Sequence, residues 1–311
     1  MSPGITNRRR VGRGLVVWIA GLAIGSVAQM QQGPSTLRPV VTVGSTTYQV
    51  LAADFHVHSF PGDGALLPWD VAREAHRRGL DAIALTNHNH MLEWDLVTAA
   101  RPLMPKDMIV LAGEEVTSPG FHLAAVGIRG PVRWSRSAAD VIDAVHAAGG
   151  VAIAAHPGHP SSQAYDEAAL RALDGVEAAH PLKETDEQRR RAVEAFYARV
   201  LAANPSIAAI GSSDFHQNAP IGSSRTFVFA TERTEAGILD ALRAGRSAGC
   251  DLRGDTTGAE PWARLSTPSC KAAAGLISRS PSRSGGVLNA FAVGCALVGL
   301  AAAISSSRDE S

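Results

Sequence analysis

LAADFHVHSFPGDG, at residues 51–64, is the most informative stretch of this chain. It begins as an apolar run and then carries His56 and His58, followed by Asp63 in a Pro-Gly-Asp-Gly turn. Residues at positions i and i+2 of a strand share a face, so both imidazoles can point at one cation. The turn can bring the carboxylate of Asp63 back toward the same place. The stretch therefore predicts a strand that ends in metal ligands.

Short apolar runs of this kind alternate with amphipathic segments through the middle of the chain. The predicted strands are 51–57, 82–86, 108–116, 121–128, 151–155, 175–179, 207–211 and 225–230. Predicted helices between them include 68–78, 138–148 and 184–201. Strands that alternate with helices over short connections indicate an α/β fold with a largely parallel sheet, either a barrel or a doubly wound sheet.

Side chains that bind metals gather at the ends of these strands. Besides the first stretch, they are His88, Glu114, Glu115, His122, His156, Asp214 and His216. The carboxyl ends of barrel strands converge on one face, so these side chains would meet there. A carboxylate can bridge two cations, and a set of histidines and carboxylates without cysteine suits Zn, Mn or Fe. The pattern predicts a site for several metal ions.

Composition excludes some function classes. The 311 residues are 45% hydrophobic, and 29 Lys+Arg balance 29 Asp+Glu. A net charge of zero argues against nucleic-acid binding as the main function. The three cysteines form no C-x-x-C pair, which excludes a disulfide scaffold and a zinc ribbon. A disulfide between Cys250 and Cys270 remains open.

The two ends of the chain predict export and a membrane anchor. Residues 1–28 place a basic segment before an uncharged apolar run, the layout of a signal peptide or an uncleaved N-terminal anchor. Residues 251–286 read as a low-complexity linker, and 287–304 is a candidate transmembrane helix. We expect a catalytic domain at 48–250 outside the cytoplasm. The basic residues before the apolar tail leave the cytoplasmic face as the alternative.

The motifs DFHVHSFPGDG, TNHNH, GEEVT, the strand that His122 begins, AHP and SSDFH together resemble those of the polymerase and histidinol phosphatase (PHP) family. The resemblance covers roughly residues 54–230. It implies a distorted (β/α)7 barrel, similar to a TIM barrel, with two or three metal ions at the carboxyl ends of the strands. Most characterised members hydrolyse phosphate esters.

Carried over by position, the resemblance implies three groups of ligands. They are His56, His58, Glu115 and Asp214 for the first ion, Glu115, His122 and His156 for the second, and Asp63, His88 and His216 for the third. Asn87 departs from the family pattern, which usually has Asp at that position. The departure concerns a charge beside His88 rather than a ligand.

The sequence thus predicts a metal-dependent phosphoesterase that acts on a small phosphate ester. Glu115, Asp214 and His216 are the expected catalytic residues, with Asp214 orienting the attacking hydroxide or accepting its proton. His216 or His180 would protonate the leaving oxygen. Arg225 and Lys183 are candidates for binding the substrate anion. The alternatives are a carboxylester or carbamate hydrolase on the same metal centre and a non-catalytic, membrane-tethered metal-binding module. A nucleic-acid polymerase is not an expected partner.

Overall fold

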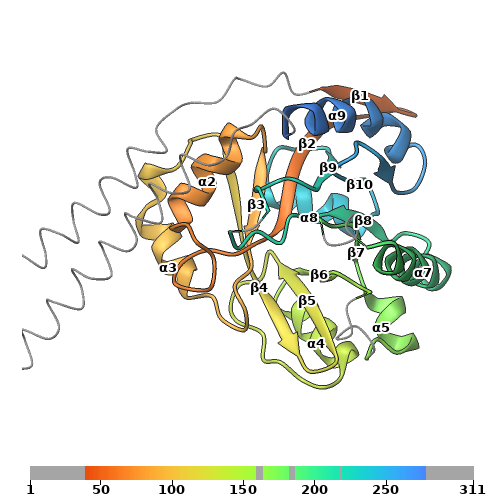
Figure 1. Cartoon of the computed structure of the whole chain (residues 1–311), viewed down its shortest axis with the longest axis horizontal. Helices are drawn as coiled ribbons and strands as arrows, with labels where there is room; N and C mark the ends of the chain where they lie inside the picture. The colour runs from red at the N-terminus through yellow and green to blue at the C-terminus, as the bar shows by residue number, and fades with distance from the viewer. Residues whose placement is uncertain (1–38, 159–163, 182–185, 218, 278–311) are drawn as a thin grey trace, which may run out of the picture. The chain divides into compact units, whose positions relative to one another are not determined.

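The computed structural model describes residues 39–277 apart from 159–163, 182–185 and 218 (Figure 1). All of these belong to one compact unit, Gly33–Ser280. The predicted signal peptide or anchor, the candidate transmembrane helix and Lys183 lie outside the described residues. No helix within the described part of the chain is long and apolar enough to cross a membrane.

Within the residues that the structure describes, eleven strands form one sheet that curls into a nearly closed barrel. Their order is β11-β10-β9-β2-β3-β4-β5-β6-β7-β8, and β1 pairs with β2 off this path. The strands are β1 (Val40–Val43), β2 (Thr46–Val57), β3 (Ala82–Leu85), β4 (Ile109–Ser118), β5 (Phe121–Val126), β6 (Val151–Ala154), β7 (Gly175–Ala179), β8 (Ala208–Gly211), β9 (Arg225–Ala230), β10 (Ser247–Cys250) and β11 (Thr256–Thr257). The predicted α/β barrel is therefore confirmed.

Strand directions decide which residues meet at the site. The sheet is mixed rather than largely parallel, because β5 and β9 run antiparallel to both of their neighbours. The pairs β2 with β3, β3 with β4, β6 with β7, and β7 with β8 are parallel. The carboxyl ends of these parallel strands and the amino ends of β5 and β9 consequently share one edge of the barrel.

The barrel closes between β8 and the β9–β10 pair through side chains. The Thr226 hydroxyl accepts from the Gly211 amide at 3.0 Å and donates to the Gly211 carbonyl at 2.9 Å, and the Ser247 hydroxyl donates to the Ala209 carbonyl at 3.0 Å. A Cβ on Gly211 would lie 2.2 Å from the Arg225 carbonyl oxygen. Only glycine allows the strands to approach this closely.

Seven α-helices and a short 3-10 helix accompany the strands in the described part of the chain. They are α2 (Pro68–Arg77), α3 (Leu92–Ala99), η1 (Arg101–Leu103), α4 (Ala138–Ala147), α5 (Glu167–Ala172), α7 (Glu187–Ala203), α8 (Glu235–Arg243) and α9 (Trp262–Ile277). Figure 1 shows α2 and α3 on one flank of the barrel and α5 and α7 on the opposite flank. Proline begins α2, and the side chains of Ser137 and Thr234 cap α4 and α8. Leu239 and Leu242 of α8 pack with the apolar residues inside the barrel.

A β-bulge turns the first two histidines into the barrel. Leu51 and Phe55 of β2 pack with the interior residues, so strict alternation would direct His56 outward. The register between β2 and β3 shifts between Asp54 and Val57. After the shift, Val57 packs with the outer apolar cluster, and the imidazole of His56 lies among the interior acids. Bulges next to functional sites often re-aim side chains in this way.

The expected linker at 251–286 is folded as far as the structure describes it. Strand β11 pairs with β10, and Cys270 of α9 forms a disulfide with Cys250. Trp262 packs against Phe229 with ring centroids 4.8 Å apart. The prediction of a linker was wrong here. Trp262, Leu265 and Cys270 recur at helical spacing on the apolar side of α9, but the many small residues between them obscure this periodicity in the sequence. The folded unit also includes β1, before the predicted boundary at residue 48.

Candidate metal centre

The nine predicted ligands lie together at the edge where the parallel strands end. They are His56 and His58 at the end of β2, Asp63 in the turn beyond, His88 after β3, Glu115 in β4, His122 in β5, His156 after β6, and Asp214 and His216 after β8. The antiparallel direction of β5 explains why a residue near its start belongs to the group. Sequence-distant side chains thus form one cluster.

Glu115 lies at the centre of the cluster and is fully buried. Its Oε1 is 2.7 Å from His122 Nδ1 and 3.0 Å from His156 Nε2. Its Oε2 is 3.3 Å from His56 Nε2 and 3.4 Å from His58 Nε2. His88 Nδ1 lies closer still to Oε2, at 2.8 Å. The two oxygens therefore face different sets of imidazoles, which is the arrangement that a bridging carboxylate requires.

Asp214 approaches the same place from the loop after β8. Its Oδ1 lies 3.3 Å from the Nε2 atoms of both His56 and His58. Its Oδ2 lies 3.5 Å from Nε2 of His180, a histidine that is 2% exposed. The backbone of Asp214 has a φ of 49°, in the left-handed region that non-glycine residues seldom adopt. Such strain at a functional side chain needs support from its surroundings.

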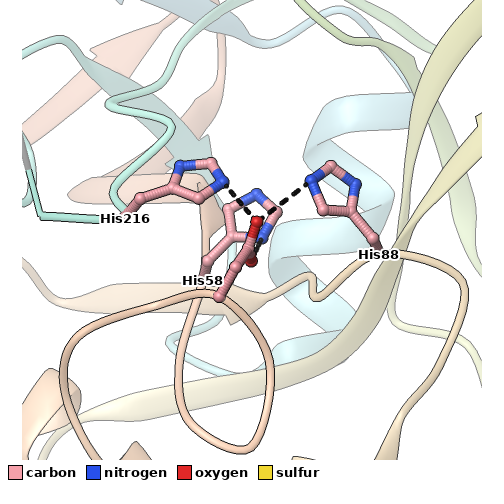
Figure 2. Close-up of side chains that lie close together, drawn as sticks. His58, His88 and His216 are labelled. Atoms are coloured by element: carbon pink, nitrogen blue, oxygen red, sulfur yellow. Dashed lines mark ion pairs between the residues drawn. The ribbon is translucent and has the colours of Figure 1, made fainter.

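Asp63 forms the open side of the cluster, where its side chain is 49% exposed. Its Oδ1 lies 3.1 Å from His58 Nδ1, and its Oδ2 lies 3.4 Å from His88 Nε2 and 3.1 Å from His216 Nε2. Figure 2 shows these three imidazoles converging from different directions. The other nitrogen of His88, Nδ1, lies 2.6 Å from the Thr117 hydroxyl and 2.8 Å from Glu115 Oε2. This side of the centre is the accessible one.

Several buried polar atoms of the site lack hydrogen-bond partners, and a bound metal ion would be a partner for them. Five buried atoms that point into the cluster have no hydrogen-bond partner: His56 Nε2, His58 Nδ1 and Nε2, Glu115 Oε2 and Asp214 Oδ1. Buried polar atoms seldom lack partners, and their convergence suits a cation. The possible ligand groups are His58, Asp63, His88 and His216; His56, His58 and Glu115; His56, His156 and Asp214; and His88, Glu115 and His122. These overlapping groups can hold divalent metal ions.

Buried charges within the cluster favour the ionised form of Glu115 and the protonated form of His56 when no ion is bound. Burial alone would raise the pKa of Glu115, but His56, His122 and His156 outweigh burial and hold it well below its ordinary value. Burial opposes the charged form of His56 as well, but Asp214, Glu177 and Glu115 raise its pKa well above the usual range. Metal ions must therefore displace protons from the site.

Two buried acids that sequence analysis missed support the cluster. Glu177 Oε1 lies 2.8 Å from His56 Nδ1, and its Oε2 accepts from the His156 amide at 2.6 Å. The signal was an acid within the otherwise apolar strand GVEAA. Asp54 accepts from the Ser213 and Gly222 amides at 3.1 and 2.8 Å, which anchors the loop that carries Asp214. Burial raises the pKa of Asp54 to about 6 against these hydrogen bonds.

Arg225 does not take the anion-binding place that the sequence suggested. Its guanidinium is buried and donates through Nε to the Gly222 carbonyl at 2.9 Å and through Nη1 to the Arg78 carbonyl at 3.2 Å. Because Arg225 begins β9 with its side chain outside the barrel, it fastens the 211–222 loop to the end of α2. Asn87 is also structural: its Oδ1 accepts from the Ser59 amide at 2.8 Å.

Comparison with known proteins also indicates a metal-dependent hydrolase. Residues 196–247 match the family model described as PHP-associated. A two-domain protein of Bacteroides vulgatus that contains a predicted PHP-like metal-dependent phosphoesterase is similar in structure. It is 27% identical over 70% of each chain, with a TM-score of 0.53.

Two further structures are less similar. A provisionally assigned metal-dependent phosphoesterase of Bifidobacterium adolescentis is 21% identical over 55% of this chain and 90% of its own, with a TM-score of 0.42. An amidohydrolase of Chromobacterium violaceum with bound sulfate and no metal is 20% identical over 55% of this chain and 89% of its own, also with a TM-score of 0.42. No curated protein matches the sequence.

Proposed function

This chain belongs to the polymerase and histidinol phosphatase (PHP) family of hydrolases, and from that membership we propose that it is a metal-dependent phosphoesterase acting on a small phosphate ester. The observation that carries the proposal is the position of Glu115. Its Oε1 faces His122 and His156, and its Oε2 faces His56, His58 and His88, all within 3.4 Å. A carboxylate placed so can join two cations in one reaction centre.

The ligands suit two or three divalent ions, with Mn, Zn or Fe as the candidates. When bound, such ions lower the pKa of a shared water, which makes hydroxide available near neutral pH, and they offset charge on phosphoryl oxygens. We propose the ligand assignment that the family resemblance implies, which the distances around Glu115, Asp214 and Asp63 support. The groups are His56, His58, Glu115 and Asp214, then Glu115, His122 and His156, and finally Asp63, His88 and His216.

Asp214 orients the attacking water in this proposal. Burial would raise its pKa, but the neighbouring His56, His180 and His58 hold it well below its ordinary value. The carboxylate is therefore ionised and accepts a hydrogen bond from water. A carboxylate with so low a pKa is a weak base, so orientation is its main contribution.

We assign protonation of the leaving oxygen to His180 rather than to His216. Both ring nitrogens of His216 face groups of the metal cluster, with Nδ1 3.0 Å from the Asp214 carbonyl and Nε2 3.1 Å from Asp63 Oδ2. His180 belongs to none of the ligand groups. Its Nε2 lies 3.5 Å from Oδ2 of Asp214. Protonation of His180 places an acid next to the carboxylate that orients the water.

We also propose that the barrel works outside the cytoplasm as an exported, membrane-anchored domain. The disulfide between Cys250 and Cys270 supports this proposal, because such bonds persist mainly in oxidising compartments. It adds an independent observation to the apolar segments at 1–28 and 287–304. The expected partner is a small-molecule ester rather than a polymerase.

The test is metal content and hydrolysis measured on the same sample. The full chain is purified and its bound Mn, Fe and Zn are determined. A phosphomonoester, a phosphodiester and an aryl carboxylester are then assayed side by side. Two to three ions per chain with phosphate release support the proposal. Cleavage of the carboxylester alone would assign the chain to the alternative ester or carbamate hydrolases. Bound metal without any turnover would indicate the non-catalytic module.

A further inference from the structure

A single buried carboxylate touches one predicted ligand on each side of Glu115. Glu177 lies in the middle of β7 and is fully buried inside the barrel. One of its oxygens is 2.8 Å from His56 Nδ1, and the other accepts from the backbone amide of His156 at 2.6 Å. His56 faces Glu115 Oε2, and His156 faces Glu115 Oε1. Glu177 thus contacts residues that face different oxygens of Glu115.

The first contact determines which nitrogen of His56 is available to a metal ion. A carboxylate at Nδ1 keeps the proton on that nitrogen and leaves the lone pair on Nε2. Nε2 points into the cluster, 3.3 Å from both Glu115 Oε2 and Asp214 Oδ1. Without Glu177, the neutral imidazole has no fixed tautomer and its ring can rotate.

The second contact supports a backbone that is unfavourable without it. His156 has a φ of 28°, outside the regions that β-strands and right-handed helices occupy. Its amide donates to Glu177, which holds this geometry and directs Nε2 toward Glu115 at 3.0 Å. The rings of His56 and His156 stack with their centroids 5.6 Å apart. One side chain therefore orients both rings.

We propose that Glu177 is a positioning residue that sets the separation of the two metal ions bridged by Glu115. The proposal rests on the metal centre of the proposed function. Glu177 acts through His56 and His156 and is not itself a ligand, because His56 Nδ1 and the His156 amide engage its two oxygens. Its removal should disturb both ions together rather than one.

The test compares Glu177→Gln with the unaltered full chain. Glutamine keeps the shape but has one acceptor oxygen, so its amide must face either His56 Nδ1 or the His156 N–H. We expect Zn²⁺ affinity, measured by competition with a chelator, to fall about 10- to 100-fold for both tightly bound ions. Glu93→Gln is the matched control, since Glu93 is another buried glutamate that touches neither His56 nor His156.

A measurement on the unaltered chain covers the case in which Glu177→Gln fails to fold. In the Zn²⁺-loaded protein labelled with ¹⁵N-histidine, His56 should show a slowly exchanging proton on Nδ1. Its absence would overturn the proposal, as would unchanged affinity in folded Glu177→Gln protein. If the unaltered chain binds no metal, the proposed function fails. If the unaltered chain binds metal and folded Glu177→Gln binds it with the same affinity, the positioning role fails but the proposed function does not.

Discussion

The hydroxyl of Ser213 donates to the carboxylate of Asp54 over 2.5 Å, although 159 residues separate them in the sequence. The same carboxylate accepts from the Ser213 and Gly222 amides. Asp54 is thus the anchor of the loop that supplies Asp214 and His216. The first motif of the chain positions the last one.

Replacing Asp54 with alanine should loosen that loop. It leaves the buried amides of Ser213 and Gly222 without acceptors, so the free energy of unfolding should fall by about 3 kcal/mol. Metal affinity should fall as well. Asp251→Ala is the control, because Asp251 also accepts from two backbone amides but at an exposed turn. Denaturant unfolding and chelator competition give both values, and unchanged metal affinity in Asp54→Ala would refute the anchoring role.

Replacing Glu115 with alanine should abolish hydrolysis. The substitution removes both oxygens that face the imidazoles, so no group remains to join the two ions. Glu114→Gln is a matched control, since Glu114 is the neighbouring acid but its Oε1 accepts from the Val132 amide on the outside of the barrel. Initial rates on the best phosphate ester decide the outcome. Retention of more than a few per cent of the activity by Glu115→Ala would be incompatible with a bridging role.

The local pattern predicted an α/β fold and placed the metal ligands at strand ends for a physical reason, and the family resemblance implied the barrel. Where an apolar run gives way to His88, Glu115 or His156, the change in polarity marks the end of the strand. It also shows which edge of the sheet is polar. The eight predicted strands correspond to β2 through β9 with small shifts at their ends. The order of the strands along the chain and the chemistry at their ends were therefore readable from local pattern, whereas the antiparallel direction of β5 and β9 was not.

What the sequence did not reveal depends on long-range packing. The bulge that turns His56 inward is a property of the β2–β3 register, not of residues 54–57 alone. Glu177 and Asp54 bind their partners through contacts across the barrel, so neither has a local motif. Helix α9 is rich in small residues, and its place in the fold depends on contacts with Phe229 and Cys250.

Replacing His180 with glutamine should reduce turnover in a way that depends on the leaving group. A proton donor matters most when the departing oxygen is strongly basic. We expect a loss of about 100-fold for an alkyl phosphate and a much smaller loss for a nitrophenyl phosphate. His146→Gln serves as the control, because His146 pairs with Asp174 away from the metal cluster. Equal losses on both substrates would exclude His180 as the proton donor.

Breaking the Cys250–Cys270 disulfide should release α9 from the barrel. Twenty residues separate the two cysteines, for which loss of the bond costs about 3 kcal/mol of unfolding free energy. Thermal unfolding of Cys270→Ser should match that of the unaltered chain under reducing conditions. Cys295→Ser should behave as the unaltered chain. A disulfide-linked peptide pair recovered from protein made in its own compartment would support export, whereas free thiols there would contradict it.

Glu114 should make the protein less stable as the pH rises toward neutrality. Burial raises the pKa of Glu114 to about 7 from its ordinary value of 4.5, and the nearby Glu93 adds to the rise. Between these pH values the folded state holds a proton that the unfolded state has lost, so the free energy of unfolding falls as the pH increases. Glutamine cannot titrate and keeps an acceptor for the Val132 amide. Relative to the unaltered chain, Glu114→Gln should therefore gain stability from pH 5 to pH 8, by at most about 3 kcal/mol. Denaturant unfolding at several pH values measures this difference, and a constant difference would mean that Glu114 is ionised in the fold throughout.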